Sequence, residues 1–203
     1  TTIYTDTCTA SSDGTPTVLV AAQMFNDASG NDNTVSNTYT WTYDSTSPTM
    51  TITSSTASTG ATTGTAAFAL TFTSNEATTD FIAGDITATS CTLSSLTGSS
   101  STVYTATCTP ADGATASVLV AAGTFSDAVS NTNSVSNTYS WTYDGTGPTM
   151  TITSDTVASG ATTATAAVVL IYTSNEVTTN FELSDITVTD CTNADFTGSG
   201  AVY

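Results

Sequence analysis

Carboxylates are the reactive side chains that this sequence carries in number. Its 203 residues include 17 Asp and Glu but no Lys, Arg or His, which gives a formal net charge of −17. Paired carboxylates can hydrolyse glycosidic bonds, but Glu76, Glu176 and Glu182 show no such pairing by spacing, and no acid–base partner can be identified for them. We therefore predict that the protein is not an enzyme.

The absence of basic side chains excludes further functions. A chain without cations cannot neutralise phosphates, so we expect no nucleic-acid partner. It offers no basic patch to anionic lipid and no imidazole for proton transfer or metal binding. Its longest apolar stretches are far too short to span a bilayer, so we expect no membrane insertion either.

Calcium is the metal that the remaining ligands could hold, because hard cations bind carboxylate, amide and carbonyl oxygens. The candidate ligands are Asp44 and Asp144 before two prolines, and Asp27 and Asp127 in two loops, with Asp32 as a further loop residue. None of these stretches is an EF-hand loop, and Asp in a turn more often caps backbone donors. We therefore expect no required cofactor and keep calcium as an open alternative.

Hydroxyl side chains dominate the composition, with Thr making up about a quarter of the chain and Thr plus Ser nearly two-fifths. No Asn-x-Ser/Thr sequence is present, so N-linked sugar is not expected. The Thr and Ser side chains are candidate sites for O-linked glycans. Thr also suits β-strands, so a structural role explains part of the same excess.

A tandem repeat organises the chain. WTYDSTSPTMTITS at 41–54 recurs as WTYDGTGPTMTITS at 141–154, and FIAGDITATSCT at 81–92 recurs as FELSDITVTDCT at 181–192. The offset is about 100 residues, with roughly 60% identity, which is the length of a whole domain. We therefore expect tandem domains.

Period-two alternation within the repeat indicates strands. Phe68, Leu70 and Phe72 alternate with small or polar residues, as do the aromatic residues of 139–143 and of their copy at 39–43. Gly- and Ser-rich turn clusters separate these segments, and no stretch shows a sustained helical period. The sequence predicts an all-β fold of immunoglobulin-like sandwiches.

An ordered series of motifs carries a family resemblance. PTMTITS, SNE…TTDF…GDIT, TVYTATCTPADG and VLVAAGTFSDAVSNTNSVSNTYSWTYD follow one another along the repeat. The series resembles the bacterial Ig-like domains of giant surface and adhesin proteins. The resemblance implies a β-sandwich at the cell surface, and in related tandem adhesin domains calcium at the linkers stiffens the rod.

The repeat is complete only once. We expect residues 47–146 to form a complete Ig-like domain, residues 1–46 to match the C-terminal half of one, and residues 147–203 to match the N-terminal half. Two half-sandwiches leave apolar faces bare and strand edges unpaired. The tail of one chain could complete the head of the next by strand complementation, which generates a filament unless the contacts close into a ring.

The four cysteines follow the same division. Four cysteines allow three pairings, and the repeat favours Cys91 with Cys108 inside the complete domain. Cys191 and Cys8 are the copies of this pair in the two half-domains, so we expect them to bond between neighbouring chains in an oxidising, extracellular setting. Four reduced cysteines are the alternative.

The sequence thus predicts a structural subunit of an extracellular filament whose partners are identical copies joined head to tail. The alternative is a segment of a long, continuous cell-surface adhesin that acts as a stalk while ligand binding lies elsewhere. Joining Tyr203 directly to Thr1 would give a connection about three residues longer than in the intact repeat, which counts weakly against the continuous chain.

Overall fold

The computed structural model describes residues 2–78, 80–198 and 200–202 and consists of short strands, turns and two 3-10 turns. Thr1 and Tyr203, which end the predicted domain ranges, lie outside the described residues. The all-β prediction is confirmed. The chain divides into two compact units, Thr1–Gly145 and Thr146–Tyr203. We use the terms N-terminal segment (residues 1–46), central domain (47–146) and C-terminal segment (147–203). The predicted division at these boundaries stays a prediction.

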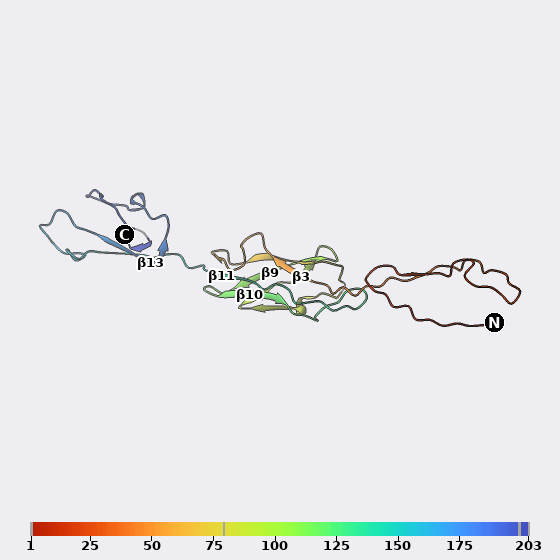
Figure 1. Ribbon diagram of the computed structural model, residues 1–203. Coiled ribbons are helices and arrows are strands. Elements are labelled where there is room, and N and C mark those ends of the chain that lie inside the picture. Colours follow the sequence, from red (N-terminus) through yellow and green to blue (C-terminus); the bar gives the residue numbers. More distant parts are fainter. Residues whose placement is uncertain (1, 79, 199, 203) are drawn as a thin grey trace. The chain divides into compact units, whose positions relative to one another are not determined.

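The central domain contains two sheets, drawn in orange to green in Figure 1. The first sheet has four strands, with β11 parallel to β4 and the other pairs antiparallel. In spatial order they are β4 (Thr62–Thr63), β11 (Tyr139–Tyr143), β10 (Thr115–Val120) and β6 (Ile86–Thr89).

The second sheet is antiparallel, and β9 lies inside it as a central strand. The 3-10 turn η1 (Ala83–Asp85) precedes β6. The strands of this sheet in spatial order are β3 (Met50–Thr53), β5 (Phe68–Ser74), β9 (Val103–Pro110) and β7 (Cys91–Leu93), with β8 (Thr97–Gly98) also paired to β9.

The core lies between these sheets and follows from the alternation along the strands. Phe68, Leu70 and Phe72 of β5 are buried, whereas the residues between them are not. Trp141 of β11 is fully buried against Phe68, with 4.7 Å between the ring centroids. Because these two rings come from different sheets, their contact closes the sandwich.

The N-terminal segment contains two short strands, β1 (Thr17–Val18) and β2 (Tyr39–Thr40), paired antiparallel. They correspond in the repeat to β10 and β11. The loop between them keeps the hydrogen bonds of its copy: Asn33 Oδ1 accepts from two backbone amides, as Asn133 Oδ1 does. This loop is therefore held by its own side chains rather than by the rest of a sandwich.

The C-terminal unit contains one three-stranded sheet, which corresponds to the β3–β5 side of the central domain. A small aromatic cluster of Tyr172, Phe181 and Phe196 packs against it, with ring centroids 5.4 to 6.3 Å apart. The elements are β12 (Met150–Thr153), β13 (Ile171–Thr178), the 3-10 turn η2 (Leu183–Asp185) and β14 (Gly200–Val202).

Candidate functional site

Several apolar residues of the N-terminal segment are exposed, although their repeat counterparts fill the core of the central domain. Tyr39 is 66% exposed, whereas its repeat counterpart Tyr139 is 4% exposed. Val18 and Phe25 are likewise exposed where their counterparts are buried. We call this surface the N-terminal face.

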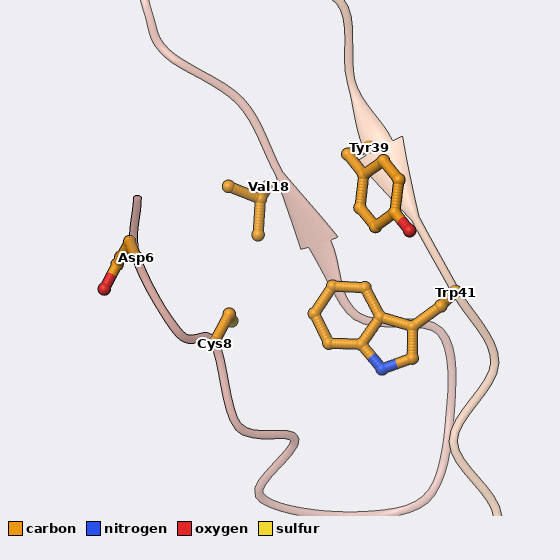
Figure 2. Close-up of a pocket in the computed structure, with 5 residues that line it drawn as sticks. All are labelled: Asp6, Cys8, Val18, Tyr39 and Trp41. Atoms are coloured by element: carbon orange, nitrogen blue, oxygen red, sulfur yellow. The ribbon is translucent and has the colours of Figure 1, made fainter. Parts of the chain in front are cut away.

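A hollow opens on the N-terminal face, lined by Asp6, Cys8, Val18, Tyr39 and Trp41. Figure 2 shows Asp6 and Cys8 on one side of the hollow and the two aromatic rings on the other, with Val18 between them. The central-domain counterparts of four of these residues, Cys108, Val118, Tyr139 and Trp141, are all buried. The hollow is thus lined by residues whose repeat counterparts lie in the core of the central domain.

The C-terminal segment also exposes apolar residues, and we call this surface the C-terminal face. Ile152 is 57% exposed, and its counterpart Ile52 is 2% exposed. Met150, Val168 and Leu170 are also exposed, although the residues at the same repeat positions are buried. Exposed apolar surface of this kind is a candidate interaction site.

Strand order in the central domain shows how the two halves of the repeat combine there. The first half of the domain supplies β3, β5 and β7, and the second half inserts β9 between β5 and β7. In the other sheet, β10 and β11 of the second half lie between β4 and β6 of the first. Every strand of the second half therefore pairs with strands of the first, so neither half can complete a sheet alone.

The cysteines occupy the same interface between the two halves. Cys91 of β7 and Cys108 of β9 form a disulfide with their Cα atoms 5.8 Å apart, which confirms the pairing predicted within the chain. Cys8 and Cys191 are free and exposed within the single chain. Each lacks the partner that its counterpart has in the central domain.

The loop aspartates named as calcium candidates cap backbone donors. Asp127 Oδ1 accepts hydrogen bonds from the amides of Val129 and Asn131, and its Oδ2 accepts from the Asn131 side chain. Asp27 makes the same contacts in the N-terminal segment. Burial alone would raise the pKa of Asp127, but the hydrogen bonds from Asn131 and the neighbouring amides outweigh it and lower the pKa.

An acidic cluster brings two of the predicted calcium candidates together. Ligand oxygens of Asp44, Glu76 and Asp127 lie within 4.8 Å of one another. Burial raises the pKa of Glu76, and the charges of Asp44 and Asp127 raise it further. Among the described residues this cluster includes neither Asp27 nor Asp144, and its third member, Glu76, showed no carboxylate pairing by spacing.

Two turn aspartates that the sequence analysis did not name form hydrogen bonds at the start of each linker, the segment between two consecutive repeats. Asp13 Oδ1 accepts from the amide of Ser45 at 2.8 Å and from its hydroxyl at 2.7 Å. Asp112 Oδ1 accepts from the amide of Gly145 at 2.6 Å, at the matching point of the next linker. Hydrogen bonds from the Ser45 and Thr46 side chains and the Ser45 amide lower the pKa of Asp13. The repeated Asp-Gly turn was the signal in the sequence.

None of the described helices has the length and apolar character needed to cross a membrane. No curated protein and no solved structure gives a match to the chain. Residues 44–143 match a family described as a bacterial Ig-like domain, and this range covers both sheets of the central domain. Domains of this family typically occur in surface proteins and are generally non-enzymatic. Residues 44–143 of this chain are therefore a bacterial Ig-like domain.

Proposed function

We propose that this chain is the structural subunit of an extracellular filament and that it assembles head to tail by completing a split Ig-like sandwich. The C-terminal face of one copy receives the N-terminal face of the next. The observation that carries the proposal is the exposure of the two faces: each consists of residues whose repeat counterparts are buried in the central domain, from its second half for the N-terminal face and from its first half for the C-terminal face.

The open side of β13 supports a defined register for this contact. In the central domain, β5 pairs with β9 from Phe68 opposite Cys108 to Thr71 opposite Thr105. Among the described residues of the C-terminal segment, β14 pairs with β13 at Thr173 and Thr178. The slot beside residues 168–171 is therefore the place for residues 5–8 of the incoming copy.

Completion of the sandwich supplies the free energy for assembly. The incoming strand adds main-chain hydrogen bonds to a bare sheet edge, as in donor-strand complementation. Each large apolar side chain that leaves water contributes about 1.5–3 kcal/mol, and both faces carry several of them. The assembly needs no cofactor.

A covalent bond then locks each junction. In the proposed register, Cys8 of one copy and Cys191 of its neighbour take the positions that Cys108 and Cys91 hold in the central domain. The two thiols lose their protons and two electrons to a disulfide oxidant, which is itself reduced to a dithiol, and one S–S bond forms. Such bonds persist in oxidising environments outside the cell.

The test combines imaging with gel electrophoresis of the purified 20.5 kDa chain under oxidising conditions. We expect filaments with two Ig-like domains per subunit, and a ladder on non-reducing gels that collapses to the single chain on reduction. Monomers at all concentrations would contradict the proposal. In material from the natural source, very large chains that survive reduction would instead support a continuous adhesin stalk.

A further inference from the structure

Asp6 is a polar residue at a position that is apolar and buried in the central domain. Its repeat counterpart is Ala106 on β9, which is 4% exposed and belongs to the hydrophobic core. Asp6 itself lines the hollow on the N-terminal face together with Cys8 and Trp41. If the junction between two copies has the same strand register as the central domain, the Asp6 carboxylate lies in the core of that junction.

The strand that would lie beside Asp6 in the junction also has a polar residue where the central domain has an apolar one. Leu93 of β7 packs against the core of the central domain, and its counterpart in the C-terminal segment is the half-buried Asn193. A buried carboxylate without a hydrogen-bond donor is strongly unfavourable, whereas an Asn amide supplies two N–H donors. The two polar residues thus replace an apolar pair on opposite sides of the junction.

The strand register brings these two positions together. Leu93 lies opposite Cys108, and Cys91 lies opposite Pro110. Position 106 is therefore related to position 93 by the same diagonal step that relates Cys108 to Cys91, whose Cα atoms are 5.8 Å apart. The ladder continues through this region, since the Ser94 amide donates to the Thr107 carbonyl. Side chains on such a diagonal are within reach of each other.

A second donor borders the same hollow. The indole Nε1 of Trp141 is buried in the central domain without a hydrogen-bond partner. Its counterpart Trp41 lines the hollow that contains Asp6. In the completed junction, the Trp41 N–H is a further donor on the face that contains the Asp6 carboxylate.

We propose that the junction between two copies contains a buried Asp6–Asn193 pair, which takes the place of the apolar Ala106–Leu93 pair and selects the two terminal segments as partners for each other. This inference rests on the proposed assembly. The same N-terminal segment inserted beside β7 of a central domain would face Leu93, which offers the carboxylate no donor. The pair therefore disfavours exchange with the halves of the central domain.

The experiment uses the full chain with Cys8→Ala and Cys191→Ala, so that the junction is non-covalent, and measures the critical concentration for polymerisation by sedimentation. Asn193→Leu should raise it at least tenfold, because Asp6 loses a partner. Adding Asp6→Ala to Asn193→Leu should return it to within about threefold of the parent, because the junction then has the apolar pair of the central domain. Asp155→Ala, at a position that is exposed in both repeats, is the matched control and should have no effect.

The outcomes separate the pair from the assembly. One outcome is that the parent polymerises while Asn193→Leu has the same critical concentration with and without the added Asp6→Ala change. That result would contradict the Asp6–Asn193 pair but would still support head-to-tail assembly. If the parent stays monomeric at every concentration, the assembly fails and the pair fails with it. Denaturant unfolding of the central domain checks that each variant is folded.

Discussion

Phe68 and Trp141 join the two halves of the repeat as well as the two sheets, with their ring centroids 4.7 Å apart. Phe68 lies on β5 in the first half of the domain, and Trp141 lies on β11, its last strand. The corresponding residues of the terminal segments are Val168 and Trp41, which the chain holds in separate units. Each therefore lacks within its own segment the partner that the central domain provides.

Replacing Trp141 or Trp41 by alanine should affect domain stability and filament formation differently. Trp141→Ala removes a fully buried ring and should lower the free energy of unfolding of the central domain by about 3–5 kcal/mol. Trp41→Ala should leave that free energy nearly unchanged and prevent filament formation, because the proposed assembly buries its ring at the junction. Urea unfolding and sedimentation measure the two effects; equal loss of stability in both variants would contradict this division of roles.

The cysteines should separate covalent locking from domain stability. Cys8→Ala should abolish the non-reducing ladder while filaments still form, because strand completion does not require the bond. Cys91→Ala with Cys108→Ala should lower the free energy of unfolding of the central domain by about 3 kcal/mol, since the closed loop spans 17 residues. A ladder that persists in Cys8→Ala would show that the link runs through another pair.

The sequence was sufficient to predict features that depend on local pattern and on the repeat. Alternation at Phe68, Leu70 and Phe72 predicted β5 and its buried face, and the matched spacing predicted the Cys91–Cys108 disulfide. Two of the three members of the acidic cluster were named from the sequence, but their proximity was not predicted. Asp44, Glu76 and Asp127 are distant in sequence, and the fold alone brings them together. Their proximity is a tertiary effect that no spacing rule reports.

The polar contacts at the linkers and the proposed Asp6–Asn193 pair needed the structure for a related reason. Asp13 and Asp112 lie in Asp-Gly turns whose register in the repeat is shifted by one residue, so simple superposition of the two copies does not align them. Asp6 aligns with Ala106 directly, but that difference gains meaning only when position 106 is known to be buried and diagonal to Leu93.

Glu76 should make the central domain more stable at acidic pH. Its pKa in the folded state is raised above the ordinary value of 4.5 by burial and by Asp44 and Asp127. The stabilising effect of its protonation is therefore complete below the unfolded pKa and is lost as the pH rises through the folded pKa. Glu76→Gln should stabilise the domain at pH 7 in the presence of a chelator, and this gain should shrink toward pH 4.

The control for this variant is Glu176→Gln, at the same repeat position in the C-terminal segment. Among the described residues Glu176 is not part of an acidic cluster, so its replacement should leave the unfolding of the central domain unchanged. Urea unfolding at both pH values measures the effect. Destabilisation by Glu76→Gln at pH 7 without any metal would contradict the repulsion among the three carboxylates.

With calcium bound, Glu76→Gln should destabilise the central domain, whereas it should stabilise the domain in chelator. The calcium hypothesis predicts that an ion held by Asp44, Glu76 and Asp127 turns their mutual repulsion into attraction. At a calcium concentration 100-fold above the dissociation constant, the domain should gain about 2.7 kcal/mol. Thermal unfolding with calcium and with chelator measures this gain, which Asp44→Asn should reduce and Asp144→Asn should not. Identical melting curves in calcium and chelator would show that the cluster binds no calcium and that Asp44 acts only through its charge.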